Sequence, residues 1–487
     1  MQRILMILEV SQKQNYIFAP KSLKENMHRS ANIARVTSSA YFAQVCPADY
    51  REEEDLVYSG GGHTVLQFDD PDRAQRFARA VTRQAMTDYP GLELFVRQMA
   101  YQENRPPKDN LNELSRQLEI KKSRRDNAFR TLSMGIEAPV STADPGPAPL
   151  GFTLPAGWSA TQQMESADEK DNFLAIVHID GNAMGARVQE IYKKCDNDWN
   201  ECRSLLDRFS REINTHYREA FDAMARELAD NLADIPYYKN RLSAHKRVHL
   251  PLRKVIGAGD DVCFITSGRH GLACAASFLR HLSGKMNSAD GKYYTACAGV
   301  VLVHKKYPFR QAYDLSEELC RNAKLFCTDY GVEASVLDFH VEYSQLKSTL
   351  EEIRADYLTD DGARLELRPL AVRGGEGVIP RERTFGFHMD QLRRLMDMLP
   401  APGSDGSRRP SQNEALARSK VKSLRPYLHQ GAVETEFALK KTSSYGLLKL
   451  NPGKGTFFTD DRGVERCLYF DTIELLDVTA LWKEEKR

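Results

Sequence analysis

The sequence predicts an α+β fold in which a ferredoxin-like βαββαβ module occurs twice and a C-terminal helical domain follows. The duplication is predicted from two occurrences of one order of elements, namely strand, helix, hairpin, helix and strand. The first occurrence lies near the start of the chain and the second in its middle. A third observation separates the copies, since residues 141–159 are dense in proline and glycine, as linkers are. The predicted units of the 487-residue chain are 1–138, a linker over 139–170, 171–345 and 346–487.

The first module begins with an apolar run that lacks a signal-peptide cleavage site and predicts a strand. A helical pattern follows, and three consecutive glycines then mark the centre of a predicted β-hairpin. A Tyr-Pro-Gly sequence ends the second helix before the last strand. The predicted elements are a strand at 4–10, a helix at 24–46, a hairpin around 60–63, a helix at about 71–88 and a strand at 92–98.

The second module repeats this order. Its first helix carries Leu, Phe, Ile, Tyr and Met residues on one face, which predicts an amphipathic helix packed on a sheet. The predicted elements are a strand at 173–179, a helix at 202–230, a hairpin at 253–266, a helix at 270–286 and strands at 293–304 and 334–341. The remainder is helix-rich and broken at 373–377 and 400–411. For residues 467–476 a strand and a short helix both fit the pattern.

The composition is typical of a soluble globular protein, with 41% hydrophobic and 28% charged residues, and a cytoplasmic location is expected. No run of ~18 apolar residues predicts a membrane span. The nine cysteines form no CxxC pair, so buried reduced thiols are expected and a structural zinc site is not. A formal charge of +1 excludes a generally basic nucleic-acid-binding protein. Two local basic stretches, at 121–125 and 239–254, are typical of solvated helix faces and loops.

Three aspartates stand where the second module could hold metal ions. Asp180 directly follows the first strand, and Asp260 and Asp261 lie at the tip of the hairpin. Because neighbouring strands are ~4.8 Å apart, these carboxylates can converge and bridge two Mg²⁺ ions. Gly-Asp alone is ordinary turn chemistry, but the added acid at a strand end predicts a nucleotidyltransferase site. There one ion lowers the pKa of an attacking ribose hydroxyl and the other stabilises the leaving pyrophosphate.

Further residues around the aspartates are predicted to contact the nucleotide. Gly259 suits a tight turn that lets a triphosphate approach the backbone, and Gly181 and Asn182 directly follow Asp180. Asn182 could touch ribose or order a metal-bound water, and a turn-forming role fits equally well. Lys324 lies on a predicted helix after the fourth strand and could reach the triphosphate as a point charge. An exposed helix lysine is the alternative interpretation.

The first module lacks acids at the equivalent positions. Ser11 ends its first strand, and Gly60, Gly61 and Gly62 form its hairpin, where bare backbone could cradle phosphate. This module is therefore predicted to be a degenerate partner that supplies a second nucleotide site. Joining two nucleotides requires a surface that faces the metal pair, so we expect the modules to pack about a pseudo-two-fold axis with both hairpin tips at one cleft.

These segments resemble the polymerase/cyclase (double-palm) large subunit of type III CRISPR effector complexes. In the second module the resemblance rests on AIVHIDGNAMGARV (175–188), PLRKVIGAGDDVCFI (251–265), TACAGVVLV (295–303) and EELCRNAK (317–324). In the first module it rests on SQKQNYIF (11–18) and YSGGGH (58–63). Residues 346–440 are more loosely similar to the helical C-terminal domain of that subunit.

The resemblance implies two palm domains that convert ATP, with Mg²⁺ or Mn²⁺, to 3′–5′ linked cyclic oligoadenylates, which act as second messengers. It also implies other CRISPR effector subunits and guide or target RNA as partners. It assigns the first-strand aspartate to Asp180, the Gly-Asp-Asp sequence to Gly259, Asp260 and Asp261, the glycine-rich loop to Gly60 to Gly62, and the start of the SxxQ segment to Ser11.

Three departures from the family pattern bear on what the chain is. Ala258 replaces the usual first glycine before Gly-Asp-Asp, no His-Asp pair is found, and the cysteine zinc site is absent from the sequence. We therefore expect a reduced form that lacks the HD nuclease domain. A stand-alone protein, a homodimer and a subunit of a larger complex all stay open.

Two other functions fit the same residues. A GGDEF-like cyclase joins two GTP molecules with the same module, but typically as a homodimer of single palms. A non-catalytic scaffold subunit of an RNA-guided complex would explain the large helical tail but not the three intact acids. Pyrophosphate release from labelled ATP or GTP in Mn²⁺ would distinguish an enzyme from a scaffold.

Overall fold

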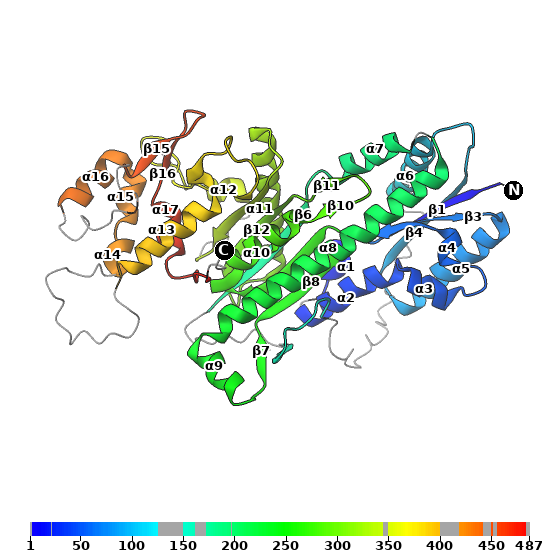
Figure 1. The fold of residues 1–487 in the computed structure, drawn as a ribbon, viewed down its shortest axis with the longest axis horizontal. Coiled ribbons are helices and arrows are strands. Elements are labelled where there is room, and N and C mark those ends of the chain that lie inside the picture. The colour runs from blue at the N-terminus through cyan, green and yellow to red at the C-terminus, as the bar shows by residue number, and fades with distance from the viewer. Residues whose placement is uncertain are drawn as a thin grey trace, which may run out of the picture.

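The computed structural model places a four-stranded and a six-stranded β-sheet along one elongated chain, with the C-terminal helices at the end opposite the N-terminus (Figure 1). It describes residues 2–20, 22–124, 150–160, 172–195, 197–343, 349–399, 418–441, 450 and 455–483. Most of the predicted linker at 139–170 and the whole predicted loop at 400–411 therefore lie outside the described residues. Among the described helices, none combines the length and the apolar character that crossing a bilayer requires.

The first module is a four-stranded antiparallel sheet in the order β2-β3-β1-β4, which is the strand order of a βαββαβ unit. Its elements are β1 (Ile4–Ser11), α1 (Lys13–Phe18), α2 (Leu23–Val36), α3 (Ser39–Val45), α4 (Glu52–Asp55), β2 (Leu56–Gly60), β3 (His63–Phe68), α5 (Pro71–Asp88), β4 (Glu93–Ala100) and α6 (Pro107–Arg124). The single helix predicted at 24–46 is two helices, because Ser38 caps α3 by accepting a hydrogen bond from the Tyr41 backbone at 3.2 Å.

The second module repeats the arrangement within a larger sheet, in the order β14-β13-β12-β6-β9-β8. The last four strands in this order, β12-β6-β9-β8, correspond to β4-β1-β3-β2 of the first module. The elements are β5 (Trp158–Ala160), β6 (Phe173–Gly181), α7 (Met184–Lys194), α8 (Trp199–Ala233), α9 (Pro236–Ser243), β7 (Val248–Leu250), β8 (Leu252–Ala258), β9 (Asp261–Ser267), α10 (Gly271–Ser283), β10 (Met286–Asn287), β11 (Lys292–Tyr293), β12 (Ala296–His304), α11 (Phe309–Tyr330) and β13 (Ser335–Val341). The predicted duplication and α+β fold class are confirmed.

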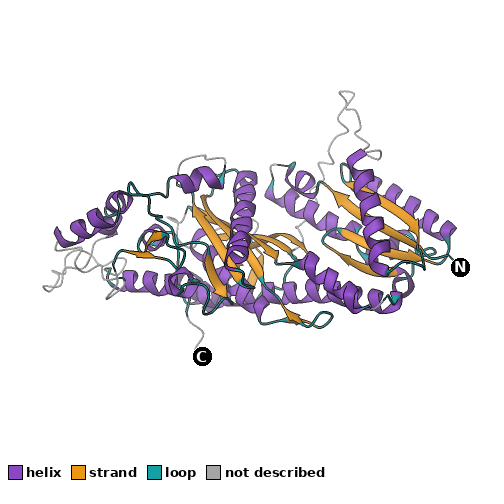
Figure 2. Cartoon of the chain, turned by 90° about the horizontal axis from the view of Figure 1, so that it is seen from above, coloured by secondary structure: helices purple, strands orange, loops and turns teal. Residues whose placement is uncertain are grey.

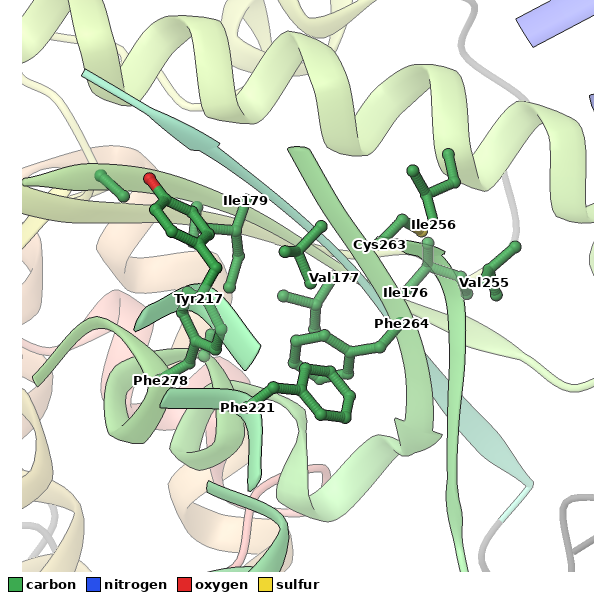
Figure 3. Close-up of a cluster of buried hydrophobic side chains, with 14 of the residues drawn as sticks. Ile176, Val177, Ile179, Tyr217, Phe221, Val255, Ile256, Cys263, Phe264 and Phe278 are labelled. Carbon is green, nitrogen blue, oxygen red and sulfur yellow. The ribbon is translucent and has the colours of Figure 1, made fainter. Parts of the chain in front are cut away.

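Aromatic packing between α8, α10 and the sheet forms the core of the second module (Figure 3). Phe221 on α8 packs edge-on against Phe264 of β9, with ring centroids 5.5 Å apart. Tyr217, one turn earlier on α8, packs against Phe278 of α10 at 5.9 Å. Burying each such ring stabilises the fold by roughly 1.5–3 kcal/mol, so the core fixes where α8 lies against the strands that end at the site.

The C-terminal region contributes one strand to the six-stranded sheet of the second module. Its elements are α12 (Leu350–Ala355), β14 (Leu370–Arg373), α13 (Phe385–Asp397), α14 (Arg418–Lys422), α15 (Arg425–Gln430), α16 (Ala432–Lys441), β15 (Phe457–Thr459), β16 (Glu465–Cys467) and α17 (Phe470–Leu475). Because β14 pairs with β13, the sheet continues past residue 345, where the sequence suggested a domain boundary. The undecided stretch 467–476 is the end of β16 followed by α17. Buried Arg368 bonds Glu474 at 2.5 Å and Asp471 at 3.1 Å, which ties α17 to this region.

The two modules contact each other through equivalent elements. Helix α8 of the second module packs on β2 of the first, and α2 of the first packs on β8 of the second. At the first contact, Arg203 donates to the Leu56 carbonyl at 2.8 Å, and Ser210 donates to the Ser59 carbonyl. The two sheets form separate groups of strands with helices between and around them (Figure 2). This exchange of equivalent contacts is the pseudo-two-fold packing that the duplication predicts.

Candidate active site

Three aspartates meet at one end of the larger sheet. In the antiparallel pairing of β6 with β9, Asp180 lies directly opposite Asp261, and Asp260 occupies the turn just before Asp261. Gly259 has a left-handed φ of 68° at this turn, which glycine adopts without a Cβ penalty. The strand register therefore brings together the three side chains that the sequence singled out.

The three carboxylates repel one another. Burial, and then the charge of Asp180, raise the pKa of Asp260 to about 6. Burial, Asp180 and Asp260 raise the pKa of Asp261 to about 8. Within the part of the chain that the structure describes, the buried Oδ1 atom of Asp261 has no hydrogen-bond partner, although 43% of the side chain is exposed. His178 Nδ1 lies 3.6 Å from this atom, but burial lowers the pKa of His178 to about 4, so the ring is neutral at pH 7.

Lys324 supplies positive charge beside these acids. Its Nζ donates to Asp180 Oδ2 at 2.6 Å and to the Gly181 carbonyl at 2.9 Å. Burial opposes the charge of the lysine, but the Asp180 carboxylate outweighs this effect and raises the pKa of Lys324. Lys324 is therefore the charge partner of Asp180 in this structure, and its contact with a triphosphate stays a prediction.

The oxygen atoms of this site fit a divalent cation. Carboxylates are the ligands that Mg²⁺ prefers, and mutually repelling carboxylates gain most from such an ion. The unpartnered Oδ1 of Asp261 is one oxygen that the ion would satisfy. Within the described part of the chain, no three His, Cys, Asp or Glu side chains are already arranged to hold a metal. Asp180 Oδ2 already accepts a hydrogen bond from Lys324, so a metal ion would compete with this lysine for the Asp180 carboxylate.

The two residues after Asp180 are fixed by packing. A Cβ on Gly181 would lie 2.6 Å from the Tyr217 hydroxyl and 3.1 Å from the Asp260 Cβ, so only glycine fits. Asn182 donates to the Ala334 carbonyl at 3.0 Å, while its buried Oδ1 has no hydrogen-bond partner among the residues described. The Asn182 amide thus links β6 to the residue before β13, and its free acceptor is the part that faces no protein donor.

The hairpin of the first module touches the aspartate hairpin. A Cβ on Gly259 would lie 3.2 Å from the backbone nitrogen of Gly61. Gly61 and Gly62 both have positive φ, 60° and 77°, as a tight glycine turn requires. Gly60 ends β2, and Ser11 ends β1 opposite Glu93 of β4. The predicted residues of the first module thus lie on one hairpin and the adjoining strand end. The tip of this hairpin contacts the tip of the hairpin that carries the aspartates, which we call the acidic tip.

Two residues near the site were missed by sequence reasoning. Lys13, at the start of α1, donates from Nζ to the Gly61 carbonyl and lies close enough to interact electrostatically with Asp261 and Asp260. Its position inside the SQKQNYIF segment was the available signal. Tyr217 lies on the helix face that the sequence predicts to be apolar, but its buried hydroxyl has no hydrogen-bond partner among the described residues and lies beside Gly181. No sequence signal distinguishes it from a core tyrosine.

Comparison with known proteins finds a family model that matches the second module. Residues 173–327 match the family model of the Cas10/Cmr2 second palm domain. A chain of a Csm1–Csm4 cassette in complex with cA4 is similar over 98% of this chain and 69% of its own, with a TM-score of 0.59 and 13% identity. Chains of cassettes in complex with AMPPNP (TM-score 0.58, 14% identity) and with cA3 (0.58, 12%) also match over 98% of this chain, and over 69% and 70% of their own. No curated protein matches the sequence.

Proposed function

We propose, on the premise that residues 173–327 are a second palm domain of the Cas10/Cmr2 family, that this chain is a metal-dependent nucleotidyltransferase. It would convert ATP to cyclic oligoadenylates and release pyrophosphate. The observation that carries the proposal is the register of β6 with β9, which sets Asp180 opposite Asp261 at a tip that touches the glycine hairpin of the other module. Palm-type phosphoryl transfer requires paired carboxylates and a second nucleotide held close to them.

In this proposal Asp180, Asp260 and Asp261 hold the divalent ions. Mg²⁺ or Mn²⁺ bound there would lower the pKa of the attacking 3′ hydroxyl and neutralise charge on the triphosphate. Lys324, released from Asp180, would contribute an ammonium to the same triphosphate. The Gly60–Gly62 hairpin would present backbone donors to the second nucleotide, which supplies the hydroxyl.

Assembly with other effector subunits is part of the proposal. The similar solved chains come from structures of Csm1–Csm4 cassettes, and some of these cassettes are in complex with cA4, cA3 or AMPPNP. We infer that this chain, like them, acts with a second protein subunit and handles adenine nucleotides. GTP is the alternative substrate, because no contact among the described residues identifies a side chain that would distinguish adenine from guanine.

The ion pair between Lys324 and Asp180 favours a second candidate, a non-catalytic scaffold in which the ammonium replaces the metal. One experiment separates the two functions: purified full-length protein is incubated with Mn²⁺ and labelled ATP or GTP, and pyrophosphate and ring products are measured. We expect product from ATP, and at least about a hundredfold less from an Asp260→Asn variant whose melting temperature is not lowered. Equal background turnover in both proteins would support the scaffold.

A further inference from the structure

Two cysteine thiols of the second module touch each other. The Sγ atoms of Cys297 on β12 and Cys327 on α11 lie 3.9 Å apart, which is van der Waals contact for sulfur. All nine cysteines of the chain lie within the described residues, where they are buried and free. A disulfide of about 2.05 Å would require these two sulfurs to approach by roughly 1.9 Å, which rotation of the two side chains can supply.

Hydrogen bonds give the two thiols different roles. Cys327 Sγ donates to the Ala334 carbonyl at 3.5 Å, so its sulfur can accept the proton of the Cys297 thiol. The hydrogen bond with Cys297 lowers the pKa of Cys327 against the effect of burial, and Lys324 acts in the same direction. The same hydrogen bond raises the pKa of Cys297. Cys327 is therefore the thiol that ionises first and the nucleophile of the pair.

The surroundings of the pair admit a small oxidant from one side. The two sulfurs belong to a small apolar cluster, separate from the main core, that also contains Phe326 and Ile379. Cys327 keeps 8% exposure beside the exposed Thr328, whereas Cys297 is 0% exposed. A small oxidant can therefore reach the nucleophile first, and Cys297 meets the product of that reaction from inside the protein.

The pair lies directly beside the candidate metal ligands. Cys297 is the residue of β12 that pairs with Asp180 of β6. Lys324, which bonds Asp180 at 2.6 Å, stands one turn before Cys327 on α11. A bond between the two sulfurs would thus join helix and strand one turn from the ion pair of Lys324 with Asp180.

We propose that Cys297 and Cys327 are a modification site, at which a hydroperoxide forms a disulfide between β12 and α11. The Cys327 thiolate attacks the peroxide, so that an S–O bond forms, the O–O bond breaks and an alcohol or water leaves. The Cys297 sulfur then attacks the sulfenic acid of Cys327, the S–S bond forms, and the oxygen leaves as water with the Cys297 proton. The two thiols together lose two electrons, and the peroxide gains both.

The cross-link would restrain the helix that carries Lys324. A helix held against the sheet at this point keeps its lysine within reach of Asp180, where the lysine competes with a metal ion. We therefore expect the oxidised protein to bind Mn²⁺ at least about twofold more weakly than the reduced protein. This consequence rests on the proposed function, whereas the disulfide does not.

Peptide mass spectrometry of the full-length wild-type protein tests the site. The reduced protein is treated with hydrogen peroxide in a chelator, and the remaining thiols are blocked with a maleimide before digestion. We expect a peptide cross-linked between Cys297 and Cys327, the loss of two of the nine thiols and recovery of both with a reductant. Calorimetric titration with Mn²⁺, after removal of peroxide and chelator, then compares the two forms.

The chain offers a matched control in a second pair of neighbouring thiols, Cys195 and Cys202. Burial raises the pKa of both, and their side chains are 1% and 0% exposed, so peroxide should leave them reduced. Cys297→Ala should stop the reaction at the sulfenic acid of Cys327, which a cyclic 1,3-dione traps. Cys327→Ala should leave Cys297 reduced.

Three results would overturn the modification site. In the first, Cys327 still reacts with maleimide after peroxide treatment, and in the second the cross-link contains Cys320, whose thiol donates to the Cys297 carbonyl at 3.2 Å. In the third, Cys195 and Cys202 are lost at the same rate, which would indicate general exposure of buried thiols. Equal Mn²⁺ affinity of the cross-linked and reduced forms would overturn the coupling to Asp180. Absence of turnover in a protein that forms the cross-link counts against the proposed function and not against this site.

Discussion

A Cβ atom on Gly259 would lie 3.2 Å from the backbone nitrogen of Gly61 and 3.5 Å from its Cα, so the hairpin tips of the two modules touch through bare backbone. Neither tip has a side chain at the point of contact. The distance between the two predicted nucleotide positions therefore depends on two glycines that lie almost 200 residues apart in the chain.

Replacing Gly259 with alanine is expected to uncouple the tips. The φ of 68° alone costs an L-residue about 1–2 kcal/mol, and the Cβ must also push Gly61 back. We expect a lower melting temperature and at least tenfold slower pyrophosphate release, measured by thermal denaturation and a coupled assay. Gly91→Ala is the matched control, because Gly91 has a φ of 83° and no atom within 4 Å of its added Cβ. If both variants lose only stability and keep full turnover, tip contact is unimportant to the reaction.

Asp261→Asn is expected to stabilise the metal-free protein while it abolishes turnover. Burial, with repulsion from Asp180 and Asp260, raises the pKa of Asp261 from 3.8 to about 8. The folded state therefore holds a proton that the unfolded state has released between these two values, and wild-type stability falls as pH rises through this window. Asparagine carries no such proton.

The gain from Asp261→Asn should be absent below pH 4 and reach on the order of 1 kcal/mol at pH 8, a modest figure because solvent screens a side chain that is 43% exposed. Urea unfolding in a chelator at pH 4, 6 and 8 measures it. A wild type that is more stable than the variant at pH 8 would show that Asp261 is held by favourable partners instead of repulsion.

Much of this architecture could be predicted because its signals are local. The strand that ends at Asp180 and the hairpin that contains Asp261 can each be predicted from a few consecutive residues. Because the two strands are neighbours in the sheet, the two aspartates then lie close together. The break between α2 and α3 was missed because one serine cap outweighs a continuous apolar pattern. Strand β14 was missed because four residues carry too short a pattern to distinguish a strand.

Contacts between the modules could not be predicted from the sequence. Lys13 lies beside Asp260 and Asp261, and Gln14 bonds Glu317 of α11, only because the modules pack in one particular orientation. That orientation depends on side-chain complementarity, such as Phe18 against Tyr313 with ring centroids 4.4 Å apart, which no periodicity encodes. The bond between Lys324 and Asp180 is a similar case within one module.

Lys324→Met is expected to raise the affinity of the nucleotide-free protein for Mn²⁺. The ammonium now bonds Asp180 at 2.6 Å and competes with a cation for that carboxylate. Both side chains are partly exposed, 33% and 40%, so the pair contributes only about 0.2–1 kcal/mol and the gain should be up to about fivefold. The nucleotide KM should rise, because the variant lacks the charge that we propose contacts the triphosphate. Calorimetric titration with Mn²⁺ and steady-state kinetics measure the two effects.

Lys285→Met is the control for this experiment, since Lys285 bonds Glu219 at the same 2.6 Å distance with similar exposure. It should change neither quantity. A Lys324→Met protein with weaker Mn²⁺ binding would mean that the lysine orients Asp180 for the metal instead of competing with it.

The remaining prediction concerns Lys13, a residue of the first module that lies near Asp260 and Asp261 of the second. Its Nζ donates to the Gly61 carbonyl, and its Cε would be 3.0 Å from a Cβ on Gly62, so the side chain is confined beside the glycine hairpin. Burial lowers the pKa of Lys13, while Glu9, Asp261 and Asp260 oppose that effect. A confined cation between the glycine hairpin of the first module and the aspartate hairpin of the second is suited to a triphosphate.

Lys13→Met keeps the length of the side chain and removes its charge. We expect the nucleotide KM to rise about tenfold, which corresponds to about 1.4 kcal/mol, with a smaller change in kcat. Lys122→Met is the control, because Lys122 bonds Glu9 and Glu119 in the same module and should alter neither parameter. Steady-state kinetics and thermal denaturation of both variants separate two roles. A lower melting temperature with an unchanged KM would show that Lys13 only holds the Gly61 hairpin in place, whereas a raised KM at an unchanged melting temperature assigns its charge to the nucleotide.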